Sequence, residues 1–166
     1  MFSLARRTAL VTGASRGLGF EIAKALAVQG ARVAINGRDP AVLATRAAEI
    51  AAAGGRAEAR PFDAADAAAA AAAIGEGPDI LVANLGLRDR RATRDIDADA
   101  FRRLLEADLV APYALARAAA LKMQPRGWGR LILVTSIAAI RAPAGSPQCL
   151  MDDDFAASTK RRGGIR

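Results

Sequence analysis

The sequence predicts an α/β fold, with a doubly wound parallel sheet of about five strands between two helical layers in a three-layer α/β/α arrangement. Two observations predict it. Short apolar runs alternate with longer segments of helical periodicity, and turn residues, often glycine, separate many of them. This alternation indicates parallel strands with right-handed crossovers, so ligands are expected beyond the carboxyl ends of the strands.

The first strand is expected at Thr8–Thr12, a short apolar run that ends at a glycine. A helix is predicted from Gly17 to Gln29, with Gly30 as its left-handed stop. Its apolar face at helical spacing is formed by Leu18, Ile22, Ala25 and Leu26.

The second and third units follow the same order. Residues 31–36 form the next expected strand, and Asp39 can cap a helix that starts at Pro40 and ends near Gly54 and Gly55. Residues 56–62 are the third strand candidate. The alanine-rich segment 66–74 is predicted to be helical from propensity more than from pattern.

The last two strands are expected at residues 79–83 and 130–136. Between them, Asp97 or Asp99 opens a longer helix, which Pro112 should kink. The predicted apolar face of this helix consists of Phe101, Leu104, Leu105 and Leu109.

Composition limits the possible functions. Cys149 is the only cysteine and histidine is absent, which excludes a disulfide framework and removes the usual zinc ligands, so no metal site is predicted. No apolar run approaches the roughly 20 residues that cross a bilayer. Residues 1–7 are too short and mixed for a secretory signal, so a cytoplasmic protein without membrane contact is expected.

A net charge of +7 suits an anionic partner. The arginines are scattered and aromatic residues make up only 4%, so the clustered phosphate contacts and base stacking of nucleic-acid binding are not expected. A phosphorylated small molecule and a simply solvated basic surface remain as alternatives.

The glycine-rich turn after the first strand is the main candidate site. A tight turn that leads into a helix N-terminus lets the backbone approach a pyrophosphate and offers free amides with a positive dipole end. A tight turn without a ligand is the simpler alternative. The pattern predicts a Rossmann-type NAD(P)-binding domain over residues 1–147, with a cofactor loop formed by Thr12, Gly13, Ser15, Arg16, Gly17, Leu18 and Gly19.

The residues after the second strand favour NADP(H) over NAD(H). An NAD site usually has an acidic residue there for the ribose 2′-hydroxyl, whereas this chain has Arg38. Arg38 and Arg16 could bind a 2′-phosphate through charge-assisted hydrogen bonds, unless both merely face solvent. Asp39 is explained more simply as a helix cap.

At these residues the chain resembles the short-chain dehydrogenase/reductase family. The glycine loop has the family spacing T-G-x-x-x-G-x-G, and Asn84-Leu85-Gly86 stands where the family has Asn-Ala-Gly. Asp63 matches the aspartate that contacts adenine, and the fifth strand ends in a serine, Ser136. The resemblance covers about residues 5–147 and implies a dinucleotide cofactor and a small carbonyl or alcohol substrate.

The resemblance also implies a catalytic serine, tyrosine and lysine with a supporting asparagine. Ser136 matches the serine, although it could bond only to backbone, and Asp108 stands in place of the asparagine. Where the tyrosine is expected the chain reads Gln-Cys-Leu, and a later Phe155 with Lys160 only partly matches Tyr-x-x-x-Lys. Tyr113, the only tyrosine, is expected to be a packing residue.

Residues 148–166 contain no further strand-helix unit and are expected to form an atypical basic tail, for which disorder is one expectation. Together with the missing tyrosine, this predicts a truncated, frame-shifted or degenerate family member. Two functions remain open: an NADP-dependent oxidoreductase, and a non-catalytic NADP(H)-binding module. A homo-oligomer, a dimer or tetramer, is expected because the fifth strand would leave an uncovered edge.

Overall fold

The computed structural model describes residues 3–89 and 91–135. These belong to two compact units, one comprising residues 1–86 and 106–134 and the other 87–105 and 135–166. Residues 136–166, which include the predicted tail, lie outside the described residues, so the predicted domain boundary at residue 147 stays a prediction.

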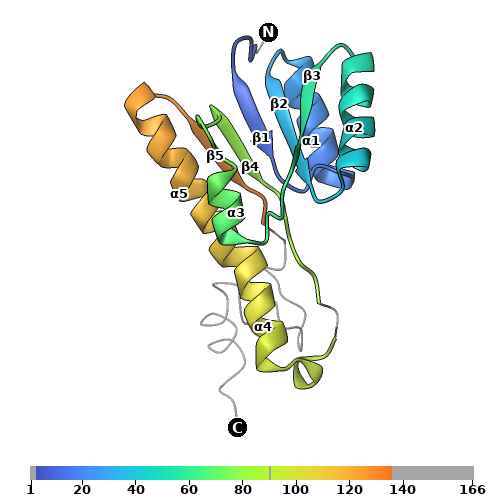
Figure 1. The fold of residues 1–166 in the computed structure, drawn as a ribbon, viewed down its shortest axis with the longest axis vertical. Coiled ribbons are helices and arrows are strands. Elements are labelled where there is room, and N and C mark those ends of the chain that lie inside the picture. The colour runs from blue at the N-terminus through green and yellow to red at the C-terminus, as the bar shows by residue number, and fades with distance from the viewer. Residues whose placement is uncertain (1–2, 90, 136–166) are drawn as a thin grey trace, which may run out of the picture. The chain divides into compact units, whose positions relative to one another are not determined.

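The first unit contains a five-stranded parallel sheet with strand order β3-β2-β1-β4-β5, which confirms the predicted α/β class (Figure 1). The strand bounds are β1 Thr8–Val11, β2 Arg32–Gly37, β3 Arg56–Pro61, β4 Ile80–Ala83 and β5 Arg130–Leu133. The order reverses between β1 and β4, because successive strands are added on one side of β1 up to β3 and then on the other. Such a reversal opens a crevice at the carboxyl ends of the strands.

Helices pack on both faces of this sheet. The helices of this unit are α1 Gly17–Val28, α2 Pro40–Ala52, α3 Ala67–Ala72 and α5 Ala111–Met123, with a π-helical segment η2 at Glu106–Val110 and a 3₁₀ turn η3 at Gln124–Arg126. In β1, Ala9 and Val11 pack toward α1 and α2, whereas Leu10 packs toward α3 and α5. This alternation along one strand produces two separate apolar cores.

The buried face of α1 differs from the predicted one. Phe20, Ala23 and Ala27 are buried, while Leu18 is 60% exposed and Ala25 is also exposed. The predicted positions Ile22 and Leu26 are half-buried at the edge of the core. The reason lies at the start of the helix, where Gly19 must face the glycine loop and thereby fixes the rotation of the helix.

The predicted ends of these helices agree with the structure. The Asp39 carboxylate accepts hydrogen bonds from the amides of Ala41 at 2.9 Å and Val42 at 3.2 Å, so it is the N-cap of α2. Gly30 has a φ of +100° directly after α1, where a side chain would strain the backbone.

The single long helix predicted before the fifth strand is wrong. Three helical segments stand in its place, at Ala98–Leu105, Glu106–Val110 and Ala111–Met123. The π-helical segment η2 stands directly before α5, and Pro112 falls in the first turn of α5, where its missing amide costs no hydrogen bond. Leu109 is 60% exposed and Tyr113 is 63% exposed, so both predictions of packing were wrong. A π turn is wider than an α turn, so the inward positions shift to Ala107 and Ala111.

One carboxylate links the amino ends of β1 and β4. The Asp79 side chain accepts hydrogen bonds from the amide of Thr8 at 2.9 Å and from its hydroxyl at 3.3 Å. Arg7 and Arg126 approach the same carboxylate at 3.9 and 3.7 Å, and Arg7 also stacks on Trp128. The two central strands are therefore held together at the edge opposite the glycine loop.

In the second unit, η1 Thr93–Asp95 precedes α4 Ala98–Leu105. The Asp97 carboxylate accepts the amide of Ala100 at 2.7 Å and opens α4, as one of the two predicted caps. Across the described part of the chain, every helix is too short or too polar to span a membrane.

Candidate cofactor site

The glycine loop lies between the end of β1 and the start of α1, beside the reversal of strand order. Gly13 and Gly17 have φ angles of +62° and +57°, in the left-handed region that favours glycine. Two left-handed residues let the chain leave the strand and enter the helix within a few residues.

Gly19 is the most crowded glycine of the loop. A β-carbon there would lie 2.4 Å from the Gly13 carbonyl oxygen and 2.5 Å from Asn84 Nδ2. Real β-carbons do not approach backbone this closely, so the first turn of α1 can rest on the loop and on the end of β4 only because residue 19 has no side chain.

The N-terminus of α1 faces outward with free backbone donors. Arg16 is the N-cap residue in an extended conformation, and among the described residues no side chain caps the helix. Gly17 and Leu18 in the first turn are exposed. The first amides and the positive end of the helix dipole are thus available to an anion, as a bound pyrophosphate requires.

Thr12 joins the glycine loop to β4. Its side chain is buried, with 1% exposure, and its hydroxyl accepts hydrogen bonds from the amides of Asn84 at 3.0 Å and Leu85 at 3.3 Å. The Asn84 amide group donates in turn to the Gly13 carbonyl at 3.4 Å. Two predicted cofactor residues, Thr12 and Asn84, are therefore brought together with the loop.

Asn36 also holds the loop, although the sequence analysis did not assign it to the site. It is 1% exposed, and its Nδ2 donates to the carbonyls of Arg60 at 3.2 Å and Phe62 at 2.9 Å. Its Oδ1 accepts the Gly13 amide at 3.5 Å. A polar residue at the end of a strand expected to be buried was the available signal, because buried amides need partners.

Arg46 is a second residue that sequence reasoning missed. From α2 its Nε donates to the Ser15 carbonyl at 3.1 Å, while its guanidinium also pairs with Glu49 at 2.7 Å and lies 4.9 Å from the Phe20 ring centroid. No local pattern could reveal this contact, because it joins residues 31 positions apart.

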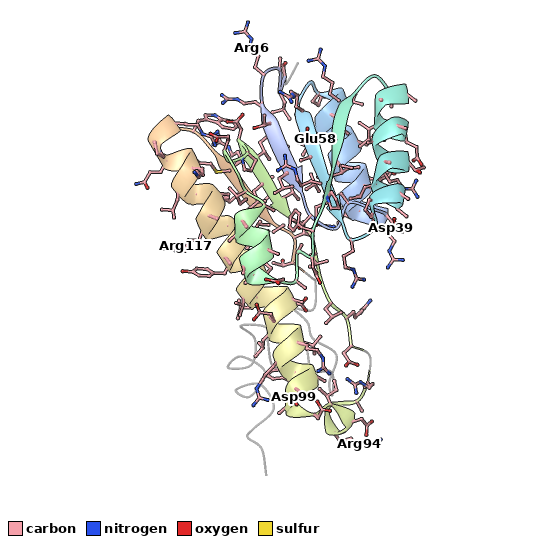
Figure 2. The ribbon with its side chains drawn as sticks, in the orientation of Figure 1. Arg6, Asp39, Glu58, Arg94, Asp99 and Arg117 are labelled. Carbon is pink, nitrogen blue, oxygen red and sulfur yellow. The ribbon has the colours of Figure 1, made fainter. Side chains whose placement is uncertain are left out.

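The end of β2 packs on the same loop. A β-carbon at Gly37 would lie 3.3 Å from Ser15 Cβ, so the residue that follows, Arg38, leaves β2 directly beside the loop. Arg16 and Arg38 are both exposed. Asp39 is used for capping α2, and Figure 2 shows it at the start of that helix.

Asp63 and Gly86 follow β3 and β4 and are both exposed. The Asp63 carboxylate accepts the amide of Ala65 at 3.0 Å, which shapes the turn after β3. Their predicted contacts with a cofactor stay predictions.

Of the predicted catalytic residues, only Asp108 belongs to the described part of the chain. Asp108 is half-buried on the π-helical segment η2. Ser136 and Lys160 lie outside the described residues. The proposed proton relay therefore also stays a prediction.

Comparison with known proteins agrees with this geometry. The family model for short chain dehydrogenase matches residues 7–148. Gluconate 5-dehydrogenase from Gluconobacter oxydans is 36% identical over 143 residues, which cover 82% of this chain and 56% of that protein.

Solved structures are similar as well. Gluconate 5-dehydrogenase from Burkholderia cenocepacia, in complex with NADP and tartrate, is 32% identical with a TM-score of 0.83 and covers 96% of this chain and 66% of its own. A 3-oxoacyl (acyl-carrier-protein) reductase from Agrobacterium tumefaciens with NADP bound is 29% identical with a TM-score of 0.84, over the same shares of the two chains.

The chain spans about half the length of the curated relatives it matches. Within that span, the sheet order and the glycine loop are those of a dinucleotide-binding fold, and the family model matches the same residues. The chain belongs to the short-chain dehydrogenase family.

Proposed function

We propose that this chain binds NADP(H) at the glycine loop and forms the cofactor-binding part of an NADP-dependent oxidoreductase that acts on a small carbonyl or alcohol. The observation that carries the proposal is a cradle formed by the glycine loop, the uncapped start of α1 and Asn84. A β-carbon at residue 19 would lie 2.4 Å from the Gly13 carbonyl oxygen and would push these parts out of place. Bound NADPH would supply a hydride to a carbonyl, and bound NADP⁺ would accept one from an alcohol.

Each part of the cradle has a role in this proposal. The α1 amides bind the pyrophosphate, and Arg16 and Arg38 bind the 2′-phosphate. Thr12 and Asn36 hold the loop in shape through their buried hydrogen bonds. The NADP in two similar structures supports the choice of cofactor.

Calorimetry with NADPH and NADH tests this proposal. NADPH should bind more tightly, and Arg38→Gln should weaken NADPH binding by about tenfold while leaving NADH binding unchanged, because the lost charge-assisted hydrogen bonds reach only the 2′-phosphate. Arg117→Gln, an equal change of charge on α5, is the matched control. Folded protein that releases heat with neither nucleotide would refute the site.

A second candidate function is binding without turnover. Tyr113, the only tyrosine of the chain, is 63% exposed on α5, and the family position of the catalytic tyrosine reads Gln148-Cys149-Leu150. Without an acid/base group, a rate factor of roughly 10²–10⁴ is lost. NADPH oxidation measured with a panel of ketones separates the two functions, since consumption of NADPH would show that the chain is an active reductase.

We further propose that the chain forms a homo-oligomer through α5. Tyr113 and Leu121 on α5 lie eight residues apart and are 63% and 53% exposed, with the exposed Arg117 midway between them. Leu109, on the preceding segment η2, is 60% exposed. Large apolar side chains exposed on one helix favour a partner surface over water. The cytoplasmic location expected from composition stays a prediction.

A further inference from the structure

A groove of about 610 Å³ lies at the edge of the sheet opposite the glycine loop. It is lined by the amino-terminal parts of β1 and β2, by β3, and by the connection from α3 to β4. The cofactor proposed above binds at the carboxyl ends of the strands, so this groove is not part of that site.

The groove exists because helices leave one part of the sheet uncovered. The helices that pack on β2 and β3 are α1 and α2, on the face of Val33 and Ile35. On the other face, α3 packs against α5, beside β4 and β5 in Figure 1. Within the described residues, no helix covers that face of β3.

Arginines stand on this uncovered face. Arg32 and Arg56 are paired in register on the neighbouring strands β2 and β3, and both line the groove. Side chains alternate along a strand, so Arg32 points to the same face as Ala34, which contacts the second apolar core. The backbones of neighbouring strands lie about 5 Å apart, and like charges on directly opposite residues are unfavourable.

The described part of the chain supplies no ion-pair partner for either arginine. Glu58, labelled on β3 in Figure 2, is paired with Arg60 at 2.8 Å. Arg60, which also lines the groove, donates to the Ala73 carbonyl at 3.3 Å. Glu76 lines the groove but forms no ion pair with Arg32 or Arg56.

We propose that this groove binds the phosphate group of a small organic molecule. Two guanidinium groups on neighbouring strands can donate to different oxygens of one tetrahedral phosphate, and a dianion removes their mutual repulsion. Ala34, Ile74 and Pro78 give the groove an apolar wall against which the organic part of the ligand packs. Phosphate from a metabolite and free inorganic phosphate share this chemistry.

Amide NMR spectra of the full chain, titrated with inorganic phosphate and with phenyl phosphate at constant ionic strength, test the proposal. Both probes should shift the signals of Arg32 and Arg56, and phenyl phosphate should bind several-fold more tightly because of the apolar wall. Equal affinity for the two probes would refute the apolar contact and assign the groove to free phosphate. Shifts confined to residues 13–19 would overturn the groove site while leaving the proposed NADP site intact.

Variants make the test specific. Arg32→Gln and Arg56→Gln should each weaken phenyl phosphate binding by about tenfold, because each removes charge-assisted hydrogen bonds. Glu76→Gln should strengthen it, because it removes a carboxylate from the groove. Arg117→Gln, with the same change of charge away from the groove, should have no effect. An equal loss of affinity in Arg32→Gln, Arg56→Gln and the control Arg117→Gln would mean general attraction to a basic protein and would refute the site.

Discussion

Gly19 leaves no room for a β-carbon, because the Gly13 carbonyl oxygen and the Asn84 side chain both lie within 2.5 Å of its position. Gly19→Ala must therefore push α1 away from the loop or separate the loop from β4. We expect a loss of about 1–3 kcal/mol in the free energy of unfolding, as for other overpacked sites, and loss of NADPH binding.

Denaturant unfolding and calorimetry measure both effects of Gly19→Ala. Gly86→Ala is the control for stability, because a β-carbon at residue 86 meets nothing within 4 Å. If Gly19→Ala bound NADPH as tightly as the wild type, the close contact at the start of α1 would not matter for the cofactor.

Asp89 is the residue with the clearest change in acidity. Hydrogen bonds from the Arg91 side chain, at 3.0 Å from its Nε, and from the Arg91 amide lower the Asp89 pKa from 3.8 to about 2. Because the folded-state pKa is lowered, the interaction is fully present above pH 3.8 and is lost as the pH falls toward 2.

Arg91→Gln should return the Asp89 pKa toward 3.8, as measured by an NMR titration of the carboxyl carbon. Arg94→Gln is the matched control, because Arg94 pairs with Asp95 instead and is 87% exposed. An unchanged Asp89 pKa in Arg91→Gln would mean that the turn, and not the guanidinium, holds the carboxylate in its charged form.

At the scale of elements, the sequence predicted the strands and caps well because their signals are local. Apolar runs ending at glycine predicted the bounds of β1 and β2 to within a residue. Asp39 marks the start of α2 and Gly30 the end of α1, as expected. These features depend on backbone chemistry within a few residues, which a single sequence displays.

The interior of the site was harder to predict. Arg46 and Asn36 reach the glycine loop across 31 and 23 positions, and no local pattern records a contact of that range. The rotation of α1 was also missed, because the close approach of Gly19 to the loop outweighs the larger apolar side chain of Leu18. Helical periodicity alone does not show that the fit of Gly19 against the loop outweighs the burial of Leu18.

The prediction of one long helix before β5 was wrong for a related reason. A π turn over Glu106–Val110 breaks the period of 3.6 residues, so a face extrapolated from Leu104 no longer reaches Leu109. Asp108 lies within that same segment. Its environment therefore depends on an irregular turn that helical spacing does not anticipate.

The exposed apolar residues Tyr113 and Leu121 on α5 predict how the molecule associates. Leu121→Glu places a carboxylate on this exposed apolar surface and should shift the wild-type oligomer toward monomer, because burying a carboxylate in an apolar interface is unfavourable.

Sedimentation velocity at several protein concentrations measures this shift for Leu121→Glu. Val28→Glu is the matched control, since Val28 is 53% exposed, as Leu121 is, but lies on α1. A wild-type protein that sediments as a monomer at every concentration would exclude the α5 interface. An oligomer that Val28→Glu disrupts and Leu121→Glu preserves would move the interface to the opposite face of the sheet, where α1 and α2 pack.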